Sequence, residues 1–182
     1  DALHKLFGVM LSEGDGGITL KRDITLPVGS YTLDTREGVM PSAADDEGIL
    51  YAMATLIQAV ELKDGALTVE RAFVEDRADK EYRSLMVDLA REWHPAYTVL
   101  QYIDLCFILK IKHLHLPFID NERYTLPSKA FPRLNEAASY TYEEIAEMRE
   151  RAKARGVIIV PEFEAPGHAA MLSKCYPEVF AN

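Results

Sequence analysis

The spacing of hydrophobic and polar residues differs between the two halves of this chain of 182 residues. In the first half, apolar and polar residues alternate over short segments, which is typical of strands with one buried face. These segments are 17–20, 24–26, 31–33, 67–69 and 72–74. An apolar stripe at helical spacing follows Asp45 and Asp46, either of which is suited to cap a helix. The stripe consists of Ile49, Met53, Leu56, Ile57 and Val60.

This order of elements, with a turn at Asp64-Gly65, predicts a small α+β domain in which one helix covers an antiparallel sheet. Residues 74–81 are rich in charge and lack apolar periodicity, which is typical of a solvated linker. We therefore expect a domain boundary in this segment. Residues 1–76 would form the α+β domain, and residues 77–182 would form the next domain.

A second pattern begins at Tyr82, where apolar runs without alternation are separated by segments with helical spacing. The three apolar runs are 85–90, 113–118 and 157–160. Such runs predict strands buried on both faces, as found in parallel sheets. Capping boxes opened by Thr98 and Thr141 predict two helices, and a third helix is expected from Ala169. The second half is therefore predicted to be α/β, either a small three-layer domain or the first three βα units of a truncated (β/α)8 TIM barrel.

The composition argues against several classes of function. The net charge of −9 argues against binding to nucleic acid or to an acidic membrane surface, because phosphates are bound by Lys and Arg. No apolar stretch reaches the roughly 20 residues that a membrane span needs. The chain starts with Asp1 and shows no secretory signal pattern, so no cellular compartment is predicted. Cys106 and Cys175 lie far apart and are expected to be unpaired thiols.

Charged groups follow each of the three predicted strands, at the edge where parallel sheets place their chemistry. They are Asp88 and Arg91 after the first strand, Asp120 after the second, and Glu162, Glu164 and His168 after the third. Arg83 opens the first strand, where a buried guanidinium needs an acidic partner, Asp88 or Glu162, or a polar ligand. Two of these groups have simpler possible roles: Asp120 as a carboxylate that caps a loop, and His168 as a histidine in a Pro-Gly turn. Trp93 and His94 would lie at the solvent edge or stack on a sugar.

Several segments of the second half resemble glycoside hydrolase family 20, the β-N-acetylhexosaminidases. Tyr82–Pro95 looks like the opening barrel strand of that family, and Leu114–Asn121 with Tyr124–Pro132 is similar to its second strand and loop. Tyr140–Ile145 and Pro161–His168 match its next helix and third strand. The preceding α+β unit also resembles the domain before the family's barrel. The resemblance thus implies a truncated TIM barrel from residue 77 onward.

The resemblance implies roles for four residues. Arg83 matches the arginine that hydrogen-bonds hydroxyl groups of the terminal sugar, and its planar array of donors suits paired oxygens. Asp120 and His168 match residues that lie beside the catalytic glutamic acid and support its orientation and protonation. Glu164 stands where the family more often has Asp, and would support His168 in the substrate-binding site.

Two departures from the family pattern affect the expected sugar pocket. Pro117 stands where a second histidine is usual, and Ile119 stands where Ser or Thr is usual. Neither is an acid-base group, but both would reshape the floor of the pocket. The resemblance therefore does not decide between GlcNAc and GalNAc.

The resemblance also implies a mechanism in which the substrate's own acetamido oxygen is the nucleophile, an exception among glycosidases. An adjacent Asp-Glu pair orients the acetamido group and protonates the leaving oxygen, and it is expected beyond Asn182. The chain is thus expected to be part of an enzyme that removes terminal β-linked N-acetylhexosamine from a carbohydrate, without metal or cofactor. Alone, it is expected to be inactive and to self-associate, because a partial barrel leaves strand edges open.

Two other functions stay open from the residues. His113 and His115 lie on one face of a strand, and such a pair is familiar from metal-dependent barrel hydrolases. Their place early in the second strand argues against a metal centre, because barrel chemistry lies at the other end. The second alternative is a non-catalytic sugar-binding module.

Overall fold

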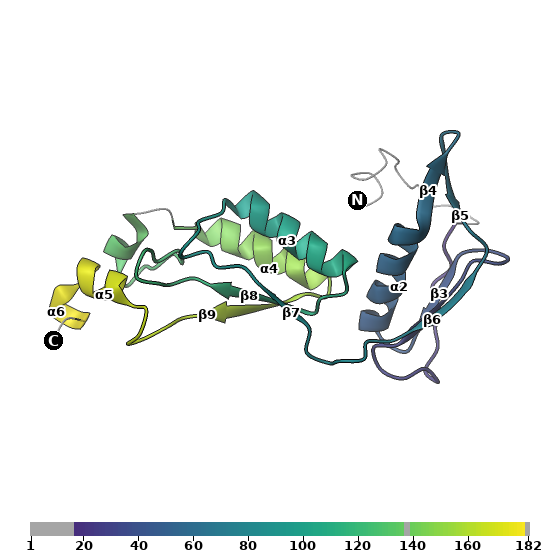
Figure 1. Cartoon of the computed structure of the whole chain (residues 1–182), viewed down its shortest axis with the longest axis horizontal. Helices are drawn as coiled ribbons and strands as arrows, with labels where there is room; N and C mark the ends of the chain where they lie inside the picture. The colour runs from purple at the N-terminus through teal and green to yellow at the C-terminus, as the bar shows by residue number, and fades with distance from the viewer. Residues whose placement is uncertain (1–16, 137–138, 181–182) are drawn as a thin grey trace. The chain divides into compact units, whose positions relative to one another are not determined.

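The structure, a computed structural model, describes residues 17–136 and 139–180, which form two compact units (Figure 1). The first unit contains the described residues up to Glu81 together with Phe107–Lys110, and the second contains Tyr82–Cys106 and the residues from Ile111 onward. The division thus falls after Glu81, whereas the predicted boundary follows residue 76. Each unit has its own sheet.

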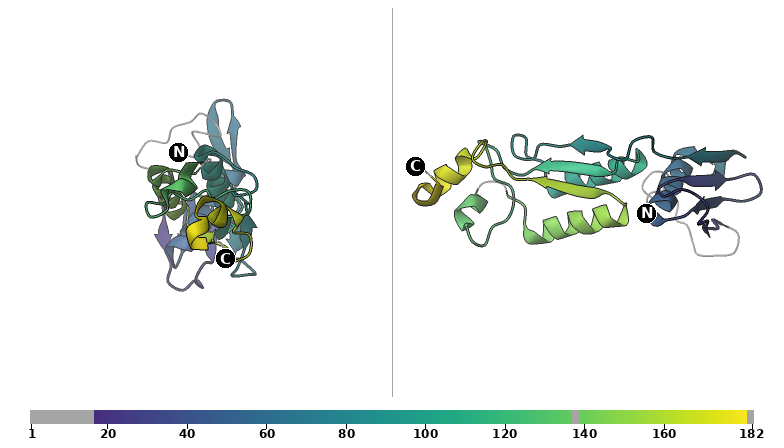
Figure 2. Two further views of the ribbon diagram at one scale, coloured as in Figure 1. Left: turned by 90° about the vertical axis from the view of Figure 1, so that its left-hand side faces the viewer. Right: turned by 90° about the horizontal axis from the view of Figure 1, so that it is seen from below.

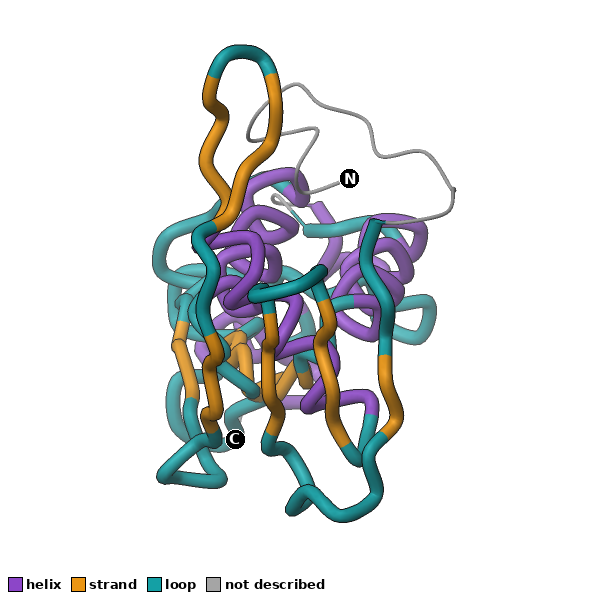
Figure 3. The backbone as a smooth tube through the Cα atoms, turned by 90° about the vertical axis from the view of Figure 1, so that its right-hand side faces the viewer, coloured by secondary structure: helices purple, strands orange, loops and turns teal. Residues whose placement is uncertain are grey.

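The first unit is built on a four-stranded sheet with the order β1-β3-β2-β6 (Figure 3). The strands are β1 (Lys21–Arg22), β2 (Tyr31–Asp34), β3 (Met40–Ala43) and β6 (Phe73–Asp76). Strand β2 pairs antiparallel with β3 and β6, whereas β1 pairs parallel with β3. The sheet is therefore mixed, with a short parallel edge strand on a largely antiparallel core.

Helix α2 (Asp46–Ala59) covers this sheet, as its apolar stripe predicts. The Asp45 side chain accepts a hydrogen bond from Gly48 N at 2.8 Å, which confirms the predicted cap. The helix and the sheet share one hydrophobic core, made of Tyr31, Leu33, Ala43, Tyr51, Ala52 and Leu56. At Gly48 the helix comes so close to the sheet that an added Cβ would lie 2.4 Å from Ser30 O. Glycine is needed there because it alone permits this approach.

A separate hairpin follows the helix, formed by β4 (Val60–Lys63) and β5 (Ala66–Val69). Its turn residues Asp64 and Gly65 both have positive φ, 52° and 79°, as the favoured two-residue hairpin turns require. The predicted turn is confirmed, but Val60 begins a strand and does not belong to the helix.

Two strand predictions in the first unit are wrong. Residues 24–26 form a turn, because the Asp23 side chain accepts hydrogen bonds from Thr25 N and Oγ1 at 3.1 and 2.5 Å. Such local bonds compete with strand pairing. Segment 17–20 contributes only an isolated bridge at Ile18. The predicted linker 74–81 is also partly structured, since its first three residues belong to β6.

The second unit contains a parallel three-stranded sheet with the order β7-β8-β9. Its strands are β7 (Ser84–Met86), β8 (His113–Pro117) and β9 (Ile158–Glu162). Helices α3 (Ala96–Ile108) and α4 (Tyr142–Ala154) lie together on one side of this sheet in Figure 1. The alternation of a strand with a helix is the α/β arrangement that the sequence predicts.

One helix start in this unit agrees with the prediction and one does not. Thr141 forms the predicted capping box, in which its hydroxyl accepts from Glu144 N and its own N–H donates to the Glu144 carboxylate. The box predicted at Thr98 is wrong, because α3 already begins at Ala96, directly after Pro95. Proline favours the first turn of a helix, so it moves the start upstream.

The predicted burial of both sheet faces is also wrong. On the face toward the helices, Leu114 and Leu116 are fully buried. On the other face, Met86 and Ile158 keep 59% and 47% of their surface exposed. Within the described residues no layer covers this second face, which also carries His113 and His115 and remains open.

Short elements lie beyond the carboxyl ends of the strands (Figure 2). They are the 3-10 helix η1 (Pro132–Glu136) and helices α5 (Ala170–Cys175) and α6 (Pro177–Phe180). A second core holds them together, formed by Ile119, Tyr124, Leu134, Ala169, Met171, Leu172 and Tyr176. Cys106 and Cys175 are free thiols, as predicted. Among the described helices, none has the length and apolar character that crossing a membrane would require.

Candidate active site

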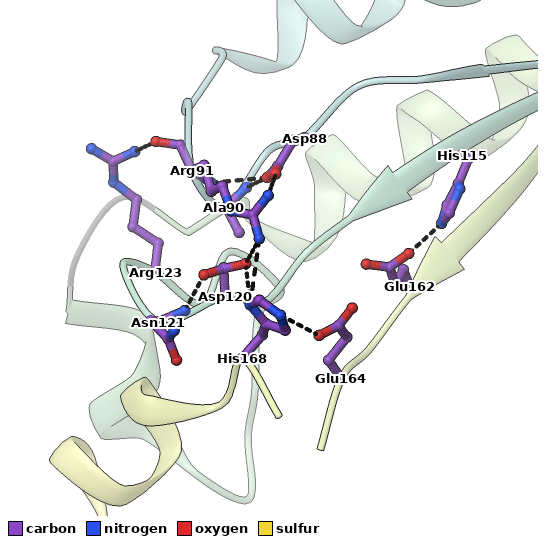
Figure 4. A network of polar contacts seen from close by, with 10 residues as sticks. All are labelled: Asp88, Ala90, Arg91, His115, Asp120, Asn121, Arg123, Glu162, Glu164 and His168. Atoms are coloured by element: carbon purple, nitrogen blue, oxygen red, sulfur yellow. Dashed lines mark hydrogen bonds and ion pairs between the residues drawn. The ribbon is translucent and has the colours of Figure 1, made fainter. Parts of the chain in front are cut away.

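The strand ends bring together most of the charged residues singled out in the sequence (Figure 4). Asp88 follows β7, Asp120 follows β8, and Glu164 and His168 follow β9. Because the three strands are parallel, their carboxyl ends lie at one edge of the sheet, and the loops that leave this edge converge. The side chains form a continuous polar network within the second unit.

Arg91 lies at the centre of this network. Its Nη2 is 2.7 Å from Asp120 Oδ2, and its Nη1 is 3.5 Å from Asp88 Oδ2. The other Asp88 oxygen accepts hydrogen bonds from Ala90 N and Arg91 N, at 3.0 and 2.9 Å, which turns the chain after β7. A single guanidinium therefore links the loop after β7 to the loop after β8.

Asp120 is the most buried charged group of the network, with 8% of its side chain exposed. Its Oδ1 accepts a hydrogen bond from Asn121 N at 2.5 Å. Burial alone would raise the pKa of Asp120, but the Asn121 N–H, the contact with Glu122 and the charge of Arg91 outweigh it, and the pKa lies below its ordinary value. The Asp120 carboxylate in turn raises the pKa of Arg91. Asp120 is thus an anion held in place, and not only a loop cap.

His168 completes the network from the loop after β9. Its Nδ1 lies 3.2 Å from Asp120 Oδ2 and 3.4 Å from Arg91 Nη2, and its Nε2 lies 3.9 Å from Glu164 Oε2. The backbone of His168 has a φ of +50°, a left-handed conformation that non-glycine residues adopt at a cost. About half of the side chain is exposed. The loop therefore turns sharply to present an accessible imidazole beside a buried carboxylate.

Two supporting residues were not predicted from the sequence. The Asn121 side chain accepts a hydrogen bond from Ala170 N at 3.2 Å, and thereby ties the loop after β8 to the start of α5. Arg123 donates to Arg91 O at 3.1 Å. Both bonds cross between loops that are distant in sequence, so no local pattern signals them.

His115 and Glu162 form a separate pair, 2.6 Å apart, on the strands themselves. The β8–β9 register explains the contact, because His115 lies opposite Val160 and Glu162 is two residues further on the same face. His113 stacks on Tyr82 with ring centroids 4.5 Å apart. Among the described residues, no group of three potential ligands could hold a metal ion, so the geometry gives the metal-centre alternative no support.

Arg83 and Trp93 are both partly buried. Arg83 is partly buried at the start of β7, where its carbonyl accepts a hydrogen bond from His113 N at 2.9 Å. Trp93 is partly buried and lies against Tyr140, with ring centroids 6.2 Å apart. Its indole Nε1 is buried without a hydrogen-bond partner among the described residues. Trp93 thus packs against Tyr140.

The arrangement as a whole can bind a polar ligand and control protons. The guanidinium and the imidazole offer donors, the carboxylates offer acceptors, and the buried Asp120 anion lies beside the imidazole of His168. These groups are not arranged as a nucleophile with its base. The part of the site described here therefore fits a supporting and binding role.

The chain is similar to several known proteins. The model of the glycosyl hydrolase family 20 catalytic domain matches residues 81–182. A β-hexosaminidase of Akkermansia muciniphila is 31% identical over 173 residues, which cover 86% of this chain and 35% of that protein. The β-subunit of β-hexosaminidase from Felis catus is 28% identical and covers 82% of this chain and 31% of its own length.

Solved structures show the same relationship. A family 20 exo-β-N-acetylglucosaminidase of Vibrio harveyi, in complex with N-acetylglucosamine, superimposes with a TM-score of 0.91 at 27% identity, covering 97% of this chain and 32% of that one. A β-N-acetylhexosaminidase of Streptomyces coelicolor gives a TM-score of 0.81 at 28% identity, covering 91% of this chain and 38% of that one. The chain thus spans about a third of the length of the relatives it matches. The match over more than half of its residues shows that the chain belongs to glycosyl hydrolase family 20.

Proposed function

We propose that the protein to which this chain contributes is a retaining glycosidase that removes terminal β-linked N-acetylhexosamine by substrate-assisted hydrolysis. The observation that carries the proposal is the Arg91–Asp120–His168 network at the carboxyl ends of parallel strands, inside the segment that matches the family 20 catalytic domain. The same network gives no nucleophile of its own, which suits a reaction in which the substrate supplies one.

Within this proposal, residues 77–182 are the first three βα units of a (β/α)8 barrel, and residues 1–76 are the domain that precedes it. The open face of the β7-β8-β9 sheet supports the barrel, because the interior of a closed barrel would cover its exposed apolar residues Met86 and Ile158. Arg83 would bind sugar hydroxyl groups. Asp120 and His168 would support the general acid, and Glu164 would support His168.

The chemistry itself requires an Asp-Glu pair from another part of the protein. The Asp-Glu dipeptide of this chain, Asp46-Glu47, lies in the first turn of α2 in the first unit, where Glu47 accepts a hydrogen bond from the Tyr51 hydroxyl at 2.8 Å. It is therefore occupied in a helix of the other unit. We expect residues 1–182 alone to show no turnover.

The test is an assay of the longer protein with an aryl N-acetyl-β-glucosaminide and with the matching glucoside that lacks the acetamido group. The proposal predicts hydrolysis of the first substrate with retention of configuration, and little turnover of the second. Equal turnover of both would refute substrate assistance. Binding of N-acetylhexosamine without any hydrolysis would instead favour the non-catalytic sugar-binding module.

A further inference from the structure

The nitrogen Nδ1 of His168 has two neighbours that make opposite demands on it. Asp120 Oδ2 lies 3.2 Å away and Arg91 Nη2 lies 3.4 Å away. An ionised carboxylate only accepts hydrogen bonds, and a guanidinium only donates them. Nδ1 must therefore carry a proton to bond to Asp120, but must offer its lone pair to bond to Arg91. One ring cannot satisfy both neighbours in the same protonation state.

The surrounding charges favour the bond to Arg91. Asp120 Oδ2 already accepts from Arg91 at 2.7 Å, and its Oδ1 already accepts from Asn121 N at 2.5 Å. This carboxylate is thus largely satisfied before His168 is considered. Arg91 is not drawn away by its other anionic partner, because Asp88 lies further off, at 3.5 Å. The nearest cation and the nearest anion of Nδ1 therefore neutralise each other.

The opposite side of the ring adds to this preference. Nε2 of His168 faces Glu164 Oε2 at 3.9 Å, so a proton on Nε2 points toward a carboxylate. The charged groups in contact with the ring are Arg91, Asp120 and Glu164, while Asp88 contacts Arg91 and Glu122 contacts Asp120. Of the groups in direct contact with Nδ1, only Arg91 can donate a hydrogen bond to it.

We propose that Arg91 is a positioning residue that selects the Nε2–H tautomer of neutral His168. Arg91 binds the Asp120 carboxylate and the Nδ1 lone pair with the same terminal nitrogen, and thereby leaves the ring's single N–H directed to Glu164. Without Arg91, Asp120 is a buried anion with one backbone donor, and a proton on Nδ1 becomes its best available partner. Loss of Arg91 then moves the proton from Nε2 to Nδ1.

The test uses long-range ¹H–¹⁵N NMR of the histidine rings of chain 1–182, at a pH where His168 is neutral. The protonated and unprotonated ring nitrogens resonate far apart, so each tautomer is read directly. His168→Asn assigns the His168 signals among the five histidines of the chain. We expect Nε2–H in the wild type and a shift of about tenfold or more toward Nδ1–H in Arg91→Gln, because hydrogen bonds to charged groups are the strong ones.

Two further variants keep the test decisive. Arg149→Gln removes an exposed cation from α4, where it pairs with Glu150, and should leave the tautomer unchanged. Arg91→Lys keeps a positive charge beside Asp120 but lacks the reach of a forked group, so it should shift the tautomer in the same direction by less. If Arg91→Gln does not fold, Arg91→Lys decides. An Nδ1–H tautomer in the wild type, or no shift in the Arg91 variants, would overturn the proposal.

The consequence for catalysis rests on the proposed function, whereas the tautomer does not. In the longer protein, Arg91→Lys should lower kcat and leave KM nearly unchanged, because Arg91 is bonded to Asp120 and His168, whereas Arg83 is the residue proposed to bind the sugar. An inactive longer protein with the expected NMR result would contradict the proposed function alone. If the Arg91 variants keep the Nε2–H tautomer and the longer protein is fully active, only the role of Arg91 would be contradicted.

Discussion

Replacement of Gly48 by alanine should destabilise the first unit, although alanine is the better helix former. Gly48 lies in the first turn of α2 and is buried against the sheet. A Cβ at this position would lie 2.4 Å from Ser30 O and 2.7 Å from the Ala43 Cβ. Both distances are below 3.0 Å, and real Cβ atoms essentially never come that close to another heavy atom. The helix would have to move away from β2 and β3.

The expected free energy follows from two opposing terms. Replacing glycine by alanine inside a helix gains up to about 1 kcal/mol from backbone entropy. Overpacking in a core costs about 1–3 kcal/mol, and contact with a backbone carbonyl lies at the upper end, because a backbone atom cannot rotate aside as a side chain can. The net expectation for Gly48→Ala is a loss of about 2 kcal/mol.

Amide hydrogen exchange of residues 46–59 measures this loss where it occurs. Exchange of the α2 amides should become about 10- to 30-fold faster in Gly48→Ala. Gly38→Ala is the matched control, since no atom lies within 4 Å of its added Cβ, and it should change stability by less than about 0.5 kcal/mol. The fluorescence of Trp93, the single tryptophan, reports the second unit. Unchanged or slower exchange of α2 in Gly48→Ala would refute the steric reasoning.

Three other predictions follow from the second unit. Asp104→Asn should cost about 2 kcal/mol, because Asp104 bonds Arg151 and Arg155 at 2.9 and 2.8 Å. Burial alone would raise the pKa of Asp104, but the two arginines outweigh it and lower the pKa. The stabilisation by Asp104 is therefore present above the unfolded pKa of about 4 and is lost as pH falls through the lowered folded pKa. Acid titration of the wild type and the variant measures this loss. Arg83→Ala in the longer protein should lower kcat/KM by the equivalent of about 2–5 kcal/mol with the fold intact; lost thermal stability with retained activity would indicate an ion-pair role. Residues 1–182 should self-associate at micromolar concentration, since β7 and β9 each have one strand neighbour within the described ranges 17–136 and 139–180, and a monomer in light scattering would contradict this.

The sequence predicts elements well where local chemistry alone decides them. Thr141 and Glu144 satisfy each other across one turn, so their pattern is enough to place the start of α4. Thr98 has an equally suitable neighbour in the sequence, but Pro95 begins the helix earlier and leaves that pattern unused. Similarly, the turn at Asp23 prevents a strand that the alternation of residues 24–26 predicts. Local patterns fail where a stronger local signal overlaps them.

Burial depends on what covers an element, and the sequence of the element does not contain this information. The apolar run from Val157 predicts a strand buried on both faces, yet Ile158 is nearly half exposed in the described residues. Its apolar character is consistent with a covering layer that would come from elsewhere in the protein. In the same way, Trp93 is placed by its contact with Tyr140, which lies in a distant loop.

In the candidate site, the positions of the charged residues could be predicted from the sequence, whereas their pairing could not. Parallel strands place their following residues at one edge, so the convergence of Asp88, Asp120 and His168 could be predicted from the order of elements alone. Which of these groups bond to one another depends on strand register and on side-chain reach, and neither leaves a local signal. Arg91 illustrates the consequence. In the sequence it is one candidate among several charged residues, whereas in the structure it contacts both the buried Asp120 anion and the His168 ring, and so controls where the proton of that ring can reside.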